Sequence, residues 1–140
     1  MFNLDDCIGI ITSRGAKALA QAFEKRLEVY NITRVQWIAI YYIGEIKGLT
    51  QRELADKIST TEPSVARLID RMEKNELVIR EKDANDRRIS TLVLTQKGNE
   101  LREKLIPIGE QFSTDITNAV GKEELEVFIQ VMEKMINNIK

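Results

Sequence analysis

Few residues of this chain have the side chains that catalysis or metal binding requires. The 140 residues include no histidine and a single cysteine, Cys7. Histidine is the usual general base and the commonest protein ligand of metals, so the chain lacks the residue that most often serves either role. We also find no nucleophile placed beside a base and no phosphate-binding loop of the form G-x-x-x-x-G-K. The sequence therefore predicts a protein that is not an enzyme and that has no metal or cofactor.

A second group of polar residues has a spacing that suits recognition. In residues 62–72 the apolar side chains recur with helical spacing and predict a core face of Val65, Leu68, Ile69 and Met72. The opposite face carries Glu62, Pro63, Ser64, Ala66 and Arg67, with Arg71 a turn later. Serine can bond a base edge or a phosphate, and arginine can pair bidentately with guanine. Thr61, at the cap, can add a phosphate contact at the helix N-terminus. The alternative is an ordinary solvated polar face.

The elements that position these residues can be predicted from apolar spacing and helix caps. Helical spacing predicts helices over residues 5–30, 34–46, 51–58, 62–72, 96–119 and 122–139. Capping boxes at Thr33–Gln36 and Thr50–Glu53 begin two of them. Alternating residues predict two strands, 78–82 and 90–94, joined by a polar hairpin loop. In this order the elements make a winged helix-turn-helix, so we expect a mainly α fold with a small β-hairpin wing and a helical dimerisation region.

Three segments resemble the MarR family of bacterial transcription regulators. Residues 83–88 read DANDRR and resemble that family's wing signature D-x-x-D-R-R. Residues 94–98 read LTQKG and resemble the L-T-x-x-G that follows the wing, while residues 64–74 resemble the recognition helix. One departure is Asn75-Glu76-Leu77, where the family often has a glycine before Leu77. The resemblance covers nearly the whole chain and implies a regulator that binds double-stranded DNA.

The resemblance also implies roles for the residues of the wing. In the family a wing arginine enters the minor groove, where narrow A·T-rich DNA concentrates negative potential. This role corresponds to Arg88 here, with Arg87 second. Asp83 and Asp86 are expected to hold the arginines and the turn rather than to contact DNA. The alternative for both arginines is a charged hairpin tip that keeps the protein soluble.

The composition fits a soluble protein with a hydrophobic core. Apolar residues make up 43% of the chain, charged residues make up 31%, and the net charge is -1, which excludes disorder for most of the chain. No apolar run reaches the length of about 18 residues that a membrane span needs. Residues 1–6 are acidic where a signal peptide would be basic, so we expect a cytoplasmic protein. The near-neutral charge argues mildly against nucleic-acid binding, so a DNA footprint must come from local placement of charge.

The helices outside the winged domain need a partner for their apolar faces. Helices 5–30 and 122–139 carry apolar stripes that a small winged domain cannot cover alone. The resemblance implies a homodimer, so we expect residues 1–32 and 96–140 to form a dimerisation region and residues 33–95 to form the DNA-binding domain. An intramolecular bundle would show the same periodicity. A two-fold dimer should bind a palindromic operator with half-sites about 34–36 Å apart.

The expected function is that of a repressor which a small-molecule effector releases from its operator. Many members of the family release DNA when a small aromatic or phenolic ligand binds between the dimerisation and DNA-binding regions. Trp37, Tyr41, Tyr42 and Phe112 are the candidates to line such a pocket here. The alternative is that these aromatic residues pack in the core, which is the commoner role of aromatic residues on buried helices.

Two other functions stay open at this point. One branch of the family senses peroxides through a cysteine in the first helix, and Cys7 lies in that helix, although nearer the N-terminus than that branch requires. An inert small hydrophobe is the alternative for this cysteine. The other function is a winged-helix protein-interaction module without DNA binding, which the balanced charge of residues 50–95 supports. The residues that argue against this module are Ser64, Arg67, Arg87 and Arg88.

Overall fold

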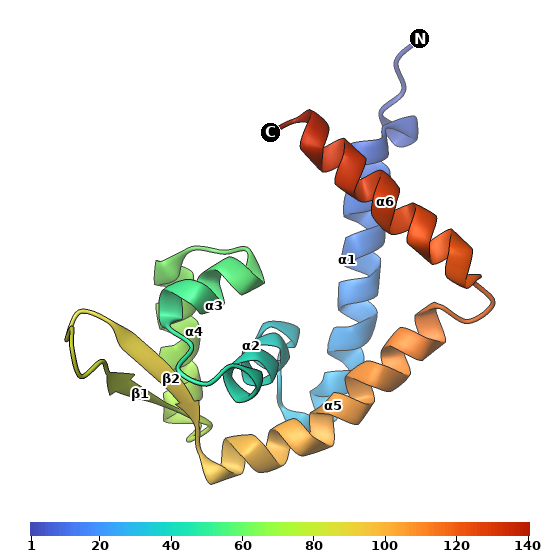
Figure 1. Cartoon of the computed structure of the whole chain (residues 1–140). Coiled ribbons are helices and arrows are strands. Elements are labelled where there is room, and N and C mark those ends of the chain that lie inside the picture. The colour runs from blue at the N-terminus through green and yellow to red at the C-terminus, as the bar shows by residue number, and fades with distance from the viewer. The chain divides into compact units, whose positions relative to one another are not determined.

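Six α-helices and one two-stranded sheet make up the fold of residues 1–140, all of which the computed structural model describes (Figure 1). The elements are α1 (Ile8–Leu27), α2 (Arg34–Glu45), α3 (Gln51–Ile58), α4 (Glu62–Lys74), β1 (Val78–Lys82), β2 (Ser90–Leu94), α5 (Gln96–Ile116) and α6 (Lys122–Asn138). The chain divides into two units, Met1–Ile108 and Gly109–Lys140, and α5 runs from the first into the second. The prediction of a mainly helical fold with a hairpin wing is confirmed.

Helices α2, α3 and α4 begin at the residues that the sequence marks as caps. Thr33 Oγ1 accepts a hydrogen bond from Gln36 N at 3.1 Å, and Gln36 Oε1 accepts one from Thr33 N at 3.0 Å. Thr50 and Glu53 form the same reciprocal pair before α3. Thr61 caps α4 in turn. Both predicted capping boxes are therefore confirmed, and each closes a helix end with its own side chains.

The core of the first unit includes one full face of α4. The predicted core residues of this helix are buried, and none of Val65, Leu68, Ile69 and Met72 is more than 4% exposed. Other buried apolar side chains of this unit are Phe23, Leu27, Ile40, Ile43, Leu49, Leu54, Leu77, Leu92 and Leu105. Each large aliphatic side chain that is fully buried contributes about 1.5–3 kcal/mol. This apolar layer fixes the rotation of α4 and leaves its polar face outward.

The hairpin is antiparallel and is tied at its base to the helix-turn-helix. Its register pairs Val78 with Leu94, and both strands have the predicted bounds. Leu92 N donates to Leu49 O at 2.8 Å, which bonds β2 to the segment before α3. In Figure 1 the loop between the strands extends away from α4 and α3. The wing is therefore a hairpin whose root is fixed and whose tip projects.

Two helices are shorter than apolar spacing predicts. The expected helix 5–30 consists of α1 flanked by 3₁₀ turns at Leu4–Asp6 and Glu28–Tyr30, and Asn31 then ends it with a left-handed φ of 55°. Helix α5 also ends before the predicted boundary, because the turn that follows places Ala119 at a φ of 64°. Apolar periodicity continues through such ends, so it cannot locate them.

Apolar side chains are exposed on α1 and, in the second unit, on α6. On α1, Ile8, Ile11 and Leu19 are 54%, 47% and 47% exposed. On α6 no residue is buried, and Phe128 is 61% exposed. No helix has both the length and the apolar character that crossing a membrane requires. Each of these two helices therefore has an apolar face without cover in its own unit.

Candidate nucleic-acid interface

The first turns of α4 bring together three of the residues predicted to contact DNA. Thr61 Oγ1 accepts from Ser64 N at 3.3 Å and donates to Ser64 Oγ at 3.0 Å. Arg67 Nη2 donates to the same hydroxyl at 3.4 Å. These bonds hold a hydroxyl group and a guanidinium group beside the positive end of the helix dipole, where anions bind favourably.

The other predicted residues of α4 continue along the helix. Glu62, Pro63 and Arg71 are exposed, and Ala66 is half-buried. Arg71 and Ser64 line a shallow pocket of about 450 Å³ beside this helix. Glu62 is favourable to the helix dipole but repels a phosphate, so among these residues the arginine is the one suited to binding an anion.

The tip of the wing is ordered by its two aspartates. Asp83 Oδ1 accepts from the backbone N–H groups of Asn85 at 2.7 Å and Asp86 at 3.1 Å, which closes the turn. Asp86 accepts from Arg88 through Nε and Nη2, both at 3.1 Å, and through the backbone N–H at 3.0 Å. Paired guanidinium bonds fix orientation as well as position. The Arg88 side chain is thus held while it stays 91% exposed, and Arg87 is exposed beside it.

The contact between Asp86 and Arg88 shifts both pKa values. The side-chain hydrogen bond from Arg88, and next its backbone N–H, lower the pKa of Asp86 below its ordinary 3.8. The hydrogen bond to Asp86 raises the pKa of Arg88. Both groups therefore stay ionised at neutral pH, and the aspartate orients the guanidinium without removing its charge.

Arg80, in β1, joins the wing to α3 and α4, although none of the sequence patterns described above predicts a role for it. Its Nε donates to Gln51 Oε1 at 2.6 Å, and its Nη2 donates to Ala66 O at 2.8 Å. Its Nη1 pairs with Asp70 at 2.8 Å and with Glu73. The side chain is 24% exposed. One guanidinium group therefore sets the position of the wing relative to the polar face of α4.

Strand alternation is the sequence signal that could have pointed to Arg80. It follows Val78 by two positions in β1, so the two residues share a face of the strand, and Val78 is buried. A charged side chain on such a face needs partners for its donors. Asp70 and Glu73 on α4 supply two of them, but only the tertiary structure shows that they face this strand.

Three of the four predicted effector residues line one pocket. Trp37 and Tyr41 stack with ring centroids 6.1 Å apart, and Tyr41 meets Tyr42 edge to face at 5.2 Å. The pocket has a volume of about 440 Å³, within the range of small-molecule sites. Lys57 Nζ lies 5.5 Å from the centroid of the Tyr42 ring, which is a cation–π contact. Phe112 belongs to the second unit and is not part of this lining.

The same aromatic residues also bond α2 to α5. Trp37 Nε1 donates to Leu105 O at 2.9 Å. Arg102 donates from Nε to Tyr41 O at 3.2 Å and from Nη2 to Glu45 at 3.0 Å, and its guanidinium lies 5.2 Å from the centroid of the Tyr41 ring. The aromatic residues therefore have a packing role in addition to lining a pocket.

Cys7 is a free, half-buried cysteine directly before α1. The basic residue that follows it most closely in sequence, Arg14, pairs with Asp5 at 2.9 Å. No three histidine, cysteine, aspartate or glutamate side chains are arranged to hold a metal ion. Nothing in this geometry singles out the thiol for chemistry.

Comparisons with known proteins give the family context of this arrangement. A family model described as "MarR family" matches residues 30–89. The transcriptional regulator HosA of Escherichia coli O157:H7 is 32% identical over 110 residues, which are 79% of this chain and 82% of that protein. The HTH-type transcriptional regulator YsmB of Bacillus subtilis is 30% identical over 125 residues, which are 89% of this chain and 86% of that protein. Among solved structures, the S. aureus MepR–DNA complex has a TM-score of 0.88 at 25% identity and covers 94% of this chain and 98% of its own.

Proposed function

This chain belongs to the MarR family of transcriptional regulators, which are not enzymes. We propose that it represses transcription by binding a palindromic DNA operator as a homodimer. In this proposal the first turns of α4 enter the major groove, and the tip of the wing reaches the adjoining minor groove. A small aromatic or phenolic effector releases the operator.

The ordered wing tip is the observation that carries this proposal. Arg88 is 91% exposed, yet Asp86 holds its guanidinium through two bonds of 3.1 Å. A side chain that is already oriented loses less conformational freedom when it binds. An exposed and oriented guanidinium at the end of a hairpin suits the negative potential of a narrow minor groove. An arginine that served only to keep the protein soluble would not need a fixed orientation.

The balanced charge of residues 50–95 is compatible with DNA binding because two of its acidic side chains pair with an arginine of the wing. Asp70 and Glu73 both pair with Arg80. The exposed arginines of α4 and the wing are Arg67, Arg71, Arg87 and Arg88. Positive side chains are therefore present on the two elements proposed to contact DNA, although the net charge of the chain is -1.

The apolar faces of α1 and α6 support a dimer. Exposed side chains such as Ile8, Ile11 and Phe128 lie in the helices for which the family resemblance implies a role in dimerisation. Extended apolar surface on a soluble chain marks an interaction site. A two-fold dimer presents two copies of α4 and therefore binds a palindrome with half-sites about 34–36 Å apart.

The pocket lined by Trp37, Tyr41 and Tyr42 supports the effector part of the proposal. It touches α3 through Lys57 and Ile58. A planar aromatic ligand can stack on these rings, and a phenolate can also approach the lysine. Because α3 packs against α4, such a ligand would act on the element that carries the polar DNA-facing residues.

A fluorescence-anisotropy titration tests the DNA-binding part directly. The protein is titrated against labelled duplex from its own upstream intergenic DNA and against a scrambled duplex, at two salt concentrations. We expect a preference of about 10³-fold or more for the upstream duplex, with affinity that falls as salt rises. Adding the protein to an in vitro transcription reaction from the same promoter should lower the amount of transcript.

Arg88→Ala is the variant that tests the wing. We expect it to weaken operator binding at least about tenfold while dimerisation stays unchanged. Lys25→Ala, which removes an exposed charge from α1, is the matched control and should keep the wild-type affinity. Equal affinity of Arg88→Ala and Lys25→Ala would contradict the wing assignment. Weak and equal binding to both duplexes calls for selection from random DNA, and failure of that selection would favour a protein-interaction module.

A further inference from the structure

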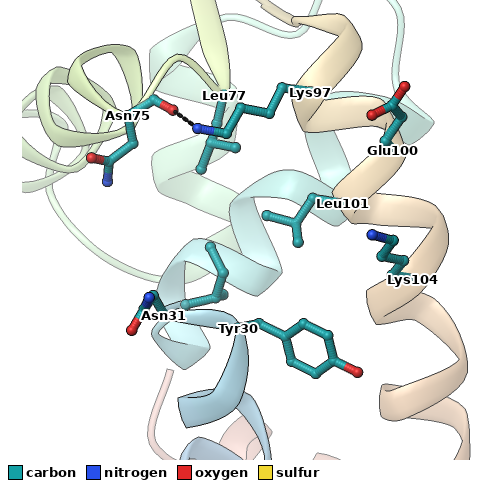
Figure 2. Close-up of a pocket in the computed structure, with 9 residues that line it drawn as sticks. Tyr30, Asn31, Asn75, Leu77, Lys97, Glu100, Leu101 and Lys104 are labelled. Atoms are coloured by element: carbon teal, nitrogen blue, oxygen red, sulfur yellow. Dashed lines mark hydrogen bonds between the residues drawn. The ribbon is translucent and has the colours of Figure 1, made fainter.

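Three contacts attach the hairpin wing to the rest of the first unit. Before β1 begins, Lys97 Nζ of α5 donates to Asn75 O at 2.9 Å, and Figure 2 shows this bond beside a pocket that Lys104 also lines. On the other strand, the backbone of β2 bonds to the segment before α3. The third contact is that of Arg80 in β1, whose guanidinium reaches α4. The first two contacts fix the root of the wing, and the third acts directly on α4.

Arg80 meets α4 in the turn that carries residues proposed to contact DNA. Its Nη2 donates to Ala66 O at 2.8 Å, and Ala66 lies between Ser64 and Arg67 in the sequence. Its Nε donates to Gln51 Oε1 at 2.6 Å, which adds α3 to the same contact. A planar guanidinium with donors on several sides fixes orientation as well as distance. A rotation of the wing relative to α4 would therefore break these bonds.

The remaining donors of Arg80 pair with two carboxylates of α4. Its Nη1 lies 2.8 Å from the carboxylate of Asp70 and also contacts Glu73. Asp70 follows Arg67 by three positions, so the two residues are neighbours on the helix surface, and an unpaired carboxylate there would repel DNA phosphates. The Arg80 side chain itself is only 24% exposed, and its donors are used inside the protein. Arg80 therefore acts on DNA binding through other residues and not by a contact of its own.

We propose that Arg80 is a positioning residue for operator binding. It holds the tip of the wing and the first turns of α4 in the relative placement that one half-site of DNA requires. This inference rests on the proposed function, in which α4 enters the major groove and Arg88 enters the adjoining minor groove. Two contacts that are already fixed relative to each other lose less conformational freedom on binding than two that move independently. Without Arg80, the wing keeps its root and its exposed arginine, but the operator must order it.

A double-mutant cycle of operator affinity tests this coupling. Fluorescence anisotropy with the upstream duplex, or with a duplex selected from random DNA, gives the Kd of the wild-type protein, Arg80→Met, Arg88→Ala and the double variant. We expect Arg80→Met alone to weaken binding about tenfold, because the wing then contributes little. For the same reason, Arg88→Ala should cost at least about tenfold in the wild-type protein but less than about threefold when residue 80 is already methionine.

One control separates positioning from loss of stability. Ile40→Ala truncates a buried side chain of α2 and destabilises the same unit through its core. It should keep the wild-type affinity under conditions in which circular dichroism shows every variant to be folded. Arg80→Lys keeps the charge but lacks the planar fork, so it should recover only part of the affinity. The same cycle built on Arg80→Lys replaces the first one if Arg80→Met does not fold.

A second control separates positioning from charge. Adding Asp70→Asn and Glu73→Gln to Arg80→Met leaves neither carboxylate unpaired, but it does not restore the bonds to α3 and α4. We expect this triple variant to bind the operator at least about threefold more weakly than the wild-type protein.

Several results would overturn the proposal. They are additive losses in the cycle, wild-type affinity in Arg80→Met, and full recovery in the triple variant. Equal weakening in Ile40→Ala would assign the effect to stability and overturn it as well. No loss in Arg88→Ala would overturn the wing assignment and this proposal together. Failure of the proposed function itself is distinguishable, since the wild-type protein would then bind neither duplex.

Discussion

Replacing Arg80 with methionine removes the guanidinium that joins β1 to α3 and α4 while keeping an apolar stem. The Arg80 side chain, which donates to Gln51 and to Ala66 O, is 24% exposed, whereas Asp70 is 65% exposed and Glu73 is 37% exposed. Hydrogen bonds from a charged donor contribute about 1.5–3 kcal/mol, but exposed ion pairs contribute only about 0–1 kcal/mol. Water can solvate both acids once the arginine is gone. We therefore expect the free energy of unfolding to fall by roughly 2–4 kcal/mol.

Urea unfolding followed by circular dichroism, at one fixed protomer concentration, measures this loss. Lys82→Met is the matched control, since it removes an exposed cation two residues further along β1 and should change the free energy by less than about 0.5 kcal/mol. Arg80→Lys should recover only part of the loss because an ammonium group lacks the planar fork. A loss in Arg80→Met no larger than that in Lys82→Met would refute the assignment of the wing contact to this guanidinium.

Three further changes probe other contacts. A Cβ at residue 98 would lie 2.2 Å from Leu77 O. Gly98→Ala should therefore lower the melting temperature and reduce the free energy of unfolding by about 1–3 kcal/mol. A wild-type melting temperature would refute this close approach. Because the folded pKa of Asp86 is lowered, its contact with Arg88 stabilises the wing above the ordinary pKa and is lost as pH falls through the lowered value. NMR titration of the Asp86 carboxyl should therefore give a midpoint below 3.8, which Arg88→Ala should raise; an unmoved midpoint would argue against the contact. Trp37→Phe removes a hydrogen bond to α5 and should lower the free energy of unfolding by about 1–2 kcal/mol in urea, whereas an unchanged value would show that this bond is dispensable.

Local signals in the sequence were sufficient to predict most elements of the winged part of the first unit. The caps at Thr33, Thr50 and Thr61 mark helix starts because each cap and its partner lie three positions apart. The strands could be predicted because side chains alternate with a period of two in residues 78–82 and 90–94, and a polar loop separates these two segments. The core face of α4 could be predicted because its apolar side chains follow one helical stripe, and all of them are buried.

Contacts between distant segments could not be predicted in the same way. Arg80 and Gln51 are 29 positions apart, and no local pattern says which acids and amides a strand arginine will face. The pocket beside Lys97 and Lys104 likewise forms only when the end of α1, the end of α4 and the start of α5 meet. Apolar spacing also could not place the left-handed residue Asn31, because helix ends depend on backbone conformation and not on the stripe.

The self-contained caps of α2, α3 and α4 have a consequence for the order of folding. A helix whose first turn is closed by its own side chains can begin before distant segments arrive, which lowers its nucleation barrier. The hairpin likewise closes over a short loop, and short loops form quickly. The contacts of Arg80 span up to 29 positions, so they are expected to form after the rate-limiting step. Substitutions of Arg80 should therefore accelerate unfolding far more than they slow refolding. In the unfolding reaction, the wing should be the first part to lose its contacts with α3 and α4.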